Sequence, residues 1–477
     1  MIFCASILIC ARILKGSDKF MSDLMEKLVS LCKRKGFVFQ SSEIYGGLNG
    51  CWDYGPLGVE VLRNIKESWW RSMTYREDIE GLDSSILMHA RVWEASGHVA
   101  GFTDPMVEDK KTNERYRLDQ LLEENGEDVN GMGLEAMIQR ALESGLKSPK
   151  GNELSEARQF NLMFKTFVGP LEDDSARIFL RPETAQGIFV NYLNVQSSMR
   201  KKLPFGIAQI GKAFRNEITT KNFLFRTREF EQMEMQYFVK PGMQDKYFDY
   251  WREERWNWYS SIGLPENKLS WHEHQGDELA HYASAAFDIQ YEFPFGSGEI
   301  EGIHNRSNFD LSQHEEFSGK KLKYFDEESR EKYVPNVIET SIGASRTTMA
   351  CLVNAYYEED VKGDTRVVMR FHPQIAPMKV AVLPLVKRDG MPELAKKVTE
   401  NLRRFFRVVY DDSGAIGRRY RRMDEIGTPF CVTIDSESLE NATVTVRDRD
   451  TMDQQRVQIT GLRSHIDAEM ESWNLST

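Results

Sequence analysis

The amino-acid sequence predicts an α+β domain built on an antiparallel sheet, followed by a smaller α/β domain. Two strand-like runs, 205–215 and 228–239, are joined by a polar loop, which favours an antiparallel pair with a long hairpin loop. Further on, strand-like runs at 380–385 and 408–410 flank an amphipathic segment, as is typical of a βαβ unit. A chain of 477 residues is also too long for one hydrophobic core.

The first domain is predicted to begin with helices. Apolar residues recur at helical spacing from Asp23 onwards and again after a glycine-rich stretch at 45–50. The polar, glycine-dotted stretch of about 106–157 is typical of an insertion between core elements. A third strand is predicted at 337–341, and the helix that follows it continues to about Tyr356. The helix predicted after the glycine-rich stretch has an apolar stripe that comprises Val59, Leu62, Ile65 and Trp69.

A proline-marked linker near 372–377 is predicted to separate the domains, which gives limits of 21–372 and 377–477. Within the second domain, one helix is expected between the first two strands. Its apolar stripe comprises Leu394, Val398, Leu402 and Phe405.

The formal net charge of −11 alone would disfavour a nucleic-acid partner, but the charge is unevenly distributed. From Pro377 onwards, 16 Lys and Arg balance 16 Asp and Glu, so the excess acid lies upstream. The balanced segment contains the run 418–422, four arginines around a tyrosine, which suits phosphate and base contacts. A solvated helix face is the alternative. Six cysteines without paired spacing indicate buried apolar residues in a reducing compartment.

Residues 2–14 are apolar apart from Ser6 and Arg12. The stretch is too short to span a bilayer and lacks a basic leading region. We interpret residues 1–20 as an extension from an overlong gene start, with Met21 as the initiator; a signal peptide is the alternative. No other stretch is typical of a membrane segment, so we expect a cytoplasmic protein without a membrane partner.

Three predicted strands each carry polar or charged side chains on one face. Residues two apart on a strand share a face, and here Arg and Glu alternate with Phe. A water-exposed face is the alternative, although such a face would tolerate almost any polar mixture. The residues concerned are Arg215 and Glu217, then Phe230, Gln232 and Glu234, then Glu339 and Ser341.

The distance between two of these residues suggests a ligand. Phe230 and Glu234 are about 13 Å apart along a strand. An aromatic ring at one end can stack on a purine, and a carboxylate at the other can bind an ammonium group. An arginine between them would neutralise phosphate charge. The spacing fits an aminoacyl-adenylate that lies along the strand.

Several strings resemble a known family. The segment 214–232 resembles motif 2 of class II aminoacyl-tRNA synthetases, and 339–346 resembles motif 3. Within that class, the sequence from about Met21 to the C-terminus resembles homodimeric class II (class IIa) glycyl-tRNA synthetases. The strings that carry this closer resemblance are 52–58, 93–98 and 181–187. The resemblance implies the class II synthetase fold and the ATP-dependent attachment of glycine to tRNA(Gly) through glycyl-adenylate.

The resemblance also implies roles for individual residues. Arg215 would bind the α-phosphate and the amino-acid carboxylate, and Arg226 would bind the γ-phosphate of ATP. Glu217 would bind the adenine amino group, with the ring held between Phe230 and Arg346. Glu339 would bind Mg²⁺. The residues implied for ATP are Arg215, Asn216, Glu217, Arg226, Phe230, Glu339 and Arg346, of which Arg215 and Arg346 would also be catalytic.

Glycine offers no side chain to recognise, so the resemblance implies a cramped acidic pocket. Alanine would be excluded by overpacking, at a cost of roughly 1–3 kcal/mol. The residues implied are Glu183, Glu234 and Ser341 around the ammonium group, with Arg306 and Asp310 in the lining.

The second domain resembles the anticodon-binding domain that the glycine, histidine, proline and threonine enzymes share. This resemblance favours RNA contact over the solvated helix face for the basic run. The residues implied for tRNA are Arg418, Arg419, Arg421, Arg422 and Arg449, with Arg447 a weaker candidate.

The sequence departs from the family's pattern at three places. Many relatives carry cysteine pairs in the insertion, whereas 109–112 and 148–151 contain none, so we predict no structural zinc. Ala90 occupies the place of the motif 1 proline near the dimer interface, although a homodimer is still expected. The apolar residues before Met21 are also atypical.

Three other functions are less consistent with the sequence. A synthetase for serine or proline would need room where Glu183 and Ser341 converge. A non-enzymatic relative that only binds nucleic acid would be expected to lose the ATP-binding arginines, and Arg215, Arg226 and Arg346 are all present. A biotin or lipoate ligase would not need the C-terminal domain. The site residues, rather than the fold, decide among these functions.

Overall fold

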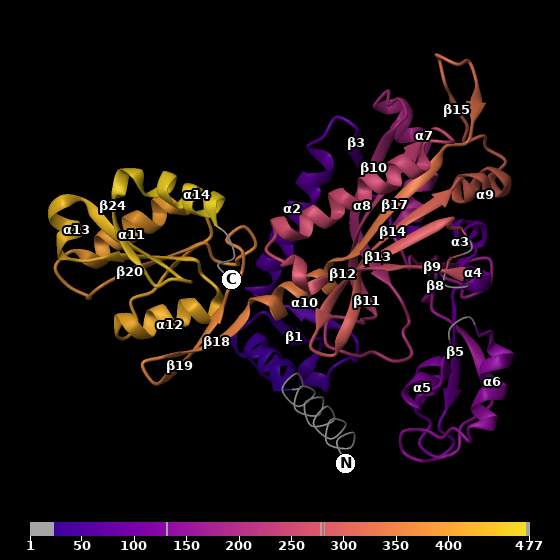
Figure 1. The fold of residues 1–477 in the computed structure, drawn as a ribbon, viewed down its shortest axis with the longest axis horizontal. Coiled ribbons are helices and arrows are strands. Elements are labelled where there is room, and N and C mark those ends of the chain that lie inside the picture. Colours follow the sequence, from indigo (N-terminus) through magenta and orange to yellow (C-terminus); the bar gives the residue numbers. More distant parts are fainter. Residues whose placement is uncertain (1–22, 130–131, 277–278, 281, 474–477) are drawn as a thin grey trace, which may run out of the picture.

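The computed structural model describes residues 23–129, 132–276, 279–280 and 282–473 (Figure 1). The interpretation of residues 1–20 therefore lies outside the described residues. Across the described ranges, no helix is long and apolar enough to cross a membrane.

A seven-stranded sheet forms the centre of the larger part of the chain (Figure 1). Its neighbouring strands run antiparallel except for the parallel pair of β10 with β3. The predicted hairpin is confirmed, because Phe205–Phe214 and Glu229–Val239 pair in antiparallel register. In spatial order the strands are β12 (Leu269–Glu273), β13 (Ala285–Phe293), β14 (Gly296–Ser307), β17 (Asn336–Gly343), β11 (Glu229–Val239), β10 (Phe205–Phe214) and β3 (Ile79–Gly81).

The alternation of residues along the central strands separates a packed face from a polar face. On β11, Met233, Met235 and Tyr237 are buried in the main hydrophobic core. The residues that alternate with them, such as Gln232 and Glu234, point to the opposite face, as the period of two requires. The helices that contact the packed face are α2 (Gly58–Thr74), α8 (Gln244–Ser261) and α10 (Ala344–Ala355).

The predicted helices are present with small differences. Residues 23–35 are helical, and the stripe of α2 is buried at Leu62, Ile65 and Trp69 but only half-buried at Val59. The helix predicted to continue to about Tyr356 ends at Ala355, where β18 (Tyr356–Val361) begins.

Residues 103–161 form a separate small sheet with its own apolar core. Its strands are β5 (Thr103–Glu108), β6 (Arg115–Arg117) and β7 (Arg158–Asn161), and its helices are α5 (Leu118–Glu124) and α6 (Leu134–Glu143). Several further elements surround the central sheet. They are β1 (Val38–Gln40), β2 (Trp52–Tyr54), β4 (Leu87–Met88), α3 (Ala90–Ala95), α4 (His98–Gly101), β8 (Lys165–Phe167), β9 (Arg177–Leu180), α7 (Ala185–Ser198), α9 (Phe309–Ser318), β15 (Tyr324–Phe325) and β16 (Lys332–Tyr333).

The C-terminal part is an α/β unit around a five-stranded sheet (Figure 1). The predicted βαβ unit is confirmed, because β20 runs parallel to both β21 and β22. Phe405 does not belong to the helical stripe: α11 ends at Leu402, and the Phe405 side chain is 50% exposed. In spatial order the strands are β21 (Val408–Tyr410), β20 (Val380–Pro384), β22 (Phe430–Ile434), β23 (Thr443–Asp448) and β24 (Gln454–Gln458), and the helices are α11 (Met391–Leu402), α12 (Ile416–Ile426), α13 (Ser436–Asn441) and α14 (Leu462–Ser472).

A buried ion cluster joins the C-terminal unit to the hairpin of β18 and β19 (Asp364–Met369). The Asp424 carboxylate of α12 accepts from Arg366 Nε at 2.9 Å and from Arg447 Nη1 at 2.9 Å. All three side chains are withdrawn from water, so each charge depends on the others for compensation.

We expect Asp424→Asn to lower the free energy of unfolding by about 3–5 kcal/mol, because it leaves two buried guanidinium groups with one countercharge fewer. Calorimetric thermal unfolding measures the change. The matched control is Asp467→Asn, which breaks the exposed Arg463–Asp467 pair and is expected to cost only about 0–1 kcal/mol. Equal losses in the two variants would contradict the structural role of the cluster.

Candidate functional site

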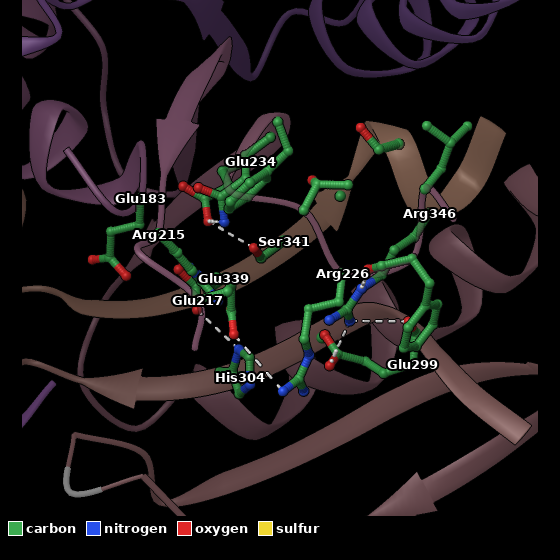
Figure 2. Close-up of a pocket in the computed structure, with 18 of the residues that line it drawn as sticks. Glu183, Arg215, Glu217, Arg226, Glu234, Glu299, His304, Glu339, Ser341 and Arg346 are labelled. Carbon is green, nitrogen blue, oxygen red and sulfur yellow. Dashed lines mark hydrogen bonds and ion pairs between the residues drawn. The ribbon is translucent and has the colours of Figure 1, made fainter. Parts of the chain in front are cut away.

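The polar face of the central sheet forms the floor of a pocket (Figure 2). Alternate residues of β11 and β17 meet there because Glu234 lies opposite Ser341 in the antiparallel register. Strand β14 adds Gly302, His304 and Arg306 from the other side of β17. The loop between β10 and β11 closes one wall with Arg215, Glu217, Phe225 and Arg226.

Charges of both signs line this pocket. Figure 2 shows Glu183 and Arg346 at opposite sides of the view, with Ser341 and Arg226 between them. A cavity that holds several carboxylates and several guanidinium groups can bind a ligand that is itself both cationic and anionic. The charged lining residues are Glu183, Glu217, Glu234, Glu299 and Glu339, and Arg215, Arg226, Arg306 and Arg346.

Glu234 lies at the centre of the acidic part. Its Oε2 accepts from the backbone N–H of Thr184 at 2.9 Å and from the Thr184 hydroxyl, and its Oε1 accepts from Ser341 Oγ at 2.6 Å and Gln232 Nε2 at 3.1 Å. Burial and the neighbouring carboxylates of Glu339 and Glu183 raise the pKa of Glu234 to about 7, although the Ser341 and Thr184 hydrogen bonds oppose this shift.

Glu339 is held by three neighbouring side chains. Arg306 Nη1 donates to its two oxygens at 2.9 and 3.0 Å, Gln236 Nε2 donates at 2.6 Å, and His304 Nδ1 lies 2.9 Å away. Burial acts to raise the pKa of Glu339, but Arg306 and His304 outweigh it and lower the pKa to about 2. Both Glu339 oxygens are therefore already engaged by protein side chains, and its Mg²⁺ role stays a prediction.

Asp310 lies behind the pocket wall instead of lining it. Its carboxylate accepts from Arg306 Nε at 2.8 Å and Arg306 Nη2 at 2.9 Å, and the side chain is buried. The prediction that Asp310 lines the pocket is therefore wrong. Its effect on the pocket passes through Arg306, which is clamped between Asp310 and Glu339.

Glu183 is held from two sides. His98 Nε2 lies 3.4 Å from one carboxylate oxygen, and Gln186 Nε2 donates to the other at 2.9 Å. Burial favours the neutral acid, but His98, Arg306 and the Gln186 amide together lower the pKa of Glu183. Glu183 is therefore a preformed carboxylate at one end of the pocket.

Three buried polar atoms of the pocket lack a hydrogen-bond partner among the residues that the structure describes. They are Glu217 Oε2, Arg226 Nη1 and Gln232 Oε1. Glu217 and Arg226 approach each other only to 3.8 Å. Unsatisfied buried polar atoms are uncommon in native proteins, and here they point to a polar ligand.

The aromatic contacts only partly match the predicted adenine clamp. The Arg215 guanidinium lies 5.4 Å from the centre of the Phe230 ring. Arg346 lies 4.5 Å from the centre of the Phe225 ring, and its Nη1 is 2.9 Å from Glu299 Oε2. Phe230 and Arg346 both line the pocket. Asn216 is not among the lining residues; its backbone N–H donates to Leu162.

Several lining residues were not predicted from the sequence, and among these Glu299, His304 and Phe225 have the clearest contacts. Strand β14 was not predicted, although Gly302, His304 and Arg306 alternate as a strand requires. Recognising 296–307 as a strand would have placed these three residues on one face.

The predicted RNA contacts are divided between the surface and the interior. Arg418 is exposed, Arg421 is half-buried, and Arg422 pairs with Asp411. Arg419 and Arg449 are buried and donate to backbone carbonyls, including those of Pro384 and Gly427. Burial contradicts the prediction for Arg419 and Arg449, and the weaker candidate Arg447 is likewise buried in the cluster with Asp424.

The two cysteine-free stretches of the insertion are joined by a buried carboxylate. Asp109 accepts from Ser148 Oγ at 2.6 Å, from Asn152 Nδ2 at 3.0 Å and from the backbone N–H groups of Lys111 and Thr112. Throughout the part of the chain that the structure describes, no three acidic, His or Cys side chains gather as a metal site.

Comparison with known proteins gives matches over both parts of the chain. The family described as "tRNA synthetase class II core domain (G, H, P, S and T)" matches residues 165–356, and "Anticodon binding domain" matches 379–469. Glycine–tRNA ligase of Treponema denticola is 57% identical over 456 residues, which cover 94% of this chain and 98% of that protein. The glycine–tRNA ligases of Chlorobaculum tepidum and Caldanaerobacter subterraneus subsp. tengcongensis are 53% and 52% identical and cover 91% and 94% of this chain, and 97% and 98% of their own lengths.

Proposed function

The chain belongs to the glycine–tRNA ligase family, and from this premise we propose that the pocket on β11, β14 and β17 condenses glycine with ATP. Aminoacyl-tRNA synthetases of this family form an adenylate and transfer the amino acid to tRNA. The observation that carries the assignment is a cluster of carboxylates beside several arginines within one cavity. An amino acid and ATP together present one ammonium group and several anionic groups, which this cavity complements.

The acidic part of the pocket is the proposed site of the glycine ammonium group. Glu183 and Glu234 offer ionisable oxygens, and Ser341 Oγ lies 2.6 Å from Glu234. Arg306 and Asp310 act as supports, because their charges are paired with each other and with Glu339. The carboxylate of glycine then faces Arg215, which also bonds to the carbonyl oxygen of Pro182.

The nucleotide is proposed to occupy the part of the pocket that contains the unsatisfied atoms. Glu217 Oε2 can accept from an exocyclic amino group, and Arg226 Nη1 can donate to phosphate. The Phe230 ring and the Arg346 guanidinium supply flat surfaces for a purine, and Phe225 supports Arg346 from behind. No side chain acts as a nucleophile: the glycine carboxylate oxygen attacks the α-phosphorus and pyrophosphate leaves.

Catalysis by this chain therefore consists of positioning and charge stabilisation. Arg215 orients the attacking carboxylate and balances the charge that develops on the α-phosphate. Arg226 and Arg346 hold the leaving pyrophosphate and the base at fixed positions. The guanidinium groups of Arg215 and Arg346 donate to backbone carbonyl oxygens before a ligand arrives, so these two groups need little reorganisation.

Glu299 is the residue that we propose for Mg²⁺ in place of Glu339. Its side chain is 45% exposed in the pocket and pairs with Arg346, so coordination sites remain for a hydrated cation. Mg²⁺ would neutralise phosphate charge on ATP when bound. Asn216 is not proposed as a nucleotide ligand.

We also propose the wider roles that this family membership implies. Residues 21–372 would carry the chemistry, with an insertion at about 106–157, and 377–477 would bind the anticodon part of tRNA(Gly). Of the arginines predicted for RNA contact, exposed Arg418 and half-buried Arg421 and Arg422 remain proposed. A cytoplasmic homodimer of the class IIa type is the proposed form.

Glycine-dependent ATP–pyrophosphate exchange tests the assignment. Across the twenty amino acids we expect exchange with glycine alone, and Arg215→Ala should lower kcat/KM about 10²–10³-fold because it removes a preorganised cation. Exchange with a larger amino acid would contradict the pocket assignment but retain the reaction class. Absence of both exchange and ATP binding would favour a non-enzymatic relative.

The raised pKa of Glu234 predicts a pH dependence. Below about pH 7 its carboxyl is neutral and attracts an ammonium group weakly, whereas above it the carboxylate is charged. Free glycine keeps its ammonium group across this range. The KM for glycine should therefore fall as pH rises from about 6 to about 8. Glu234→Gln should raise that KM and remove the dependence; an unchanged slope in the variant would assign the titration to another group.

Two matched substitutions separate the roles of the carboxylates. Glu299→Gln is expected to raise the Mg²⁺ concentration for half-maximal exchange about tenfold, because it removes one anionic oxygen from the cation. Glu339→Gln should leave that concentration unchanged and raise the KM for glycine, since Arg306 loses a charged partner. Titration of exchange rate with Mg²⁺ measures both. The reverse pattern would restore the magnesium role of Glu339.

A further inference from the structure

Gln186 is a buried amide that lies outside the lining of the pocket, in the first turn of α7. Its side chain reaches three groups. Nε2 donates to Glu183 Oε1 at 2.9 Å and to Asp310 Oδ1 at 3.0 Å, and Oε1 lies 2.8 Å from His314 Nε2. The side chain is fully buried, so water does not compete for these bonds.

The chemistry of these partners allows one orientation of the amide. Two carboxylates can only accept, so the NH₂ group must face Glu183 and Asp310. The carbonyl oxygen then faces His314, whose Nε2 must carry a proton to donate to it. His314 itself is buried on α9, and burial lowers its pKa, so the neutral Nε2–H tautomer is the form that fits.

One side chain thus connects the two halves of the acidic part of the pocket. On one side it holds Glu183, and on the other it holds Asp310, which clamps Arg306 against Glu339. Helices α7 and α9 and strands β14 and β17 all contribute to this chain of contacts. A shift of the Gln186 amide would move a carboxylate at each end.

We propose that Gln186 is a positioning residue for glycine. Its amide fixes the distance between the Glu183 carboxylate and the clamp formed by Asp310, Arg306 and Glu339. His314 in turn fixes the orientation of that amide. The inference rests on the proposed function, because it takes the glycine ammonium group as the ligand of Glu183. A pocket whose carboxylates cannot move apart excludes a substrate with one more carbon. Specificity for glycine therefore depends on a residue that does not touch glycine.

The test measures KM for glycine and for ATP by pyrophosphate exchange with the full chain. Gln186→Ala removes two hydrogen bonds to charged groups, so the KM for glycine should rise about tenfold or more while the KM for ATP stays unchanged. Gln196→Ala is the matched control, since Gln196 lies on the same helix and donates only to the backbone oxygen of Lys201. Its two KM values should equal those of the unmodified chain.

A second variant gives a readout that a purely structural role would not change. Gln186→Glu keeps the shape but places an ionisable acid between two carboxylates. When protonated it can still donate one hydrogen bond, and when ionised it repels both partners. Its kcat/KM for glycine should therefore fall as pH rises, which is opposite to the unmodified chain. The groups that face this position are Glu183, Asp310, His314, Arg306, Glu339, His98 and Tyr282.

The outcomes distinguish this inference from the assignment of function. Glycine exchange by the unmodified chain, with a selective rise in glycine KM in Gln186→Ala and a reversed pH slope in Gln186→Glu, supports the inference. If Gln186→Ala does not fold, the pH slope of Gln186→Glu decides. Suppose that the unmodified chain exchanges with glycine but both Gln186 variants have the same glycine KM as Gln196→Ala. This result overturns the inference about Gln186 and leaves the assignment of function intact. Absence of glycine exchange by the unmodified chain overturns both.

Discussion

The clamp of Arg306 between Asp310 and Glu339 is the constraint on which the rest of the site depends. Buried carboxylates repel one another and lose hydration, so a cluster of them survives only if cations and hydrogen-bond donors compensate each charge. Arg306 supplies four of its hydrogen bonds to these two carboxylates. With part of that negative charge compensated, Glu183 and Glu234 can remain in the same cavity and present charge to a ligand.

The central strands perform two tasks at once because of their two-residue period. On β11 the odd-numbered Met233, Met235 and Tyr237 build the core against the helices, and the even-numbered Gln232 and Glu234 build the pocket. Packing on one face therefore fixes the backbone that positions the other face. A shift of register by one residue would bury the carboxylate in the apolar core, so the core specifies the geometry of the site.

Much of this organisation was predictable from the sequence, and the failures have identifiable causes. Alternation found the faces of β11 and β17 because polar and apolar residues there follow one another strictly. Strand β14 was missed because its glycines and mixed charges obscure the same alternation, and Glu299 and His304 were missed with it. The burial of two arginines could not be predicted from the sequence. Arg419 lies in a basic run and Arg449 follows the end of a strand, which are places typical of surface residues. In the structure both guanidinium groups are in the interior and donate to backbone carbonyl oxygens. The pairing of Arg306 with Glu339, which lie on different strands and far apart in sequence, is set by the tertiary fold and could not be predicted from local pattern.

The acidic part of the pocket lacks a positive charge that a bound ammonium group would supply. Against the effect of burial, His98 lowers the pKa of Glu183 and Arg306 lowers the pKa of Glu339, whereas burial and these same two carboxylates raise the pKa of Glu234 to about 7. The cations of the protein compensate these three carboxylates only in part. An ammonium group bound among the carboxylates adds a positive charge and would stabilise the ionised form of Glu234. Binding energy then comes from relief of repulsion among fixed charges. Buried hydrogen bonds fix the positions of these carboxylates. A larger amino acid therefore cannot push the carboxylates apart and gain the same binding energy.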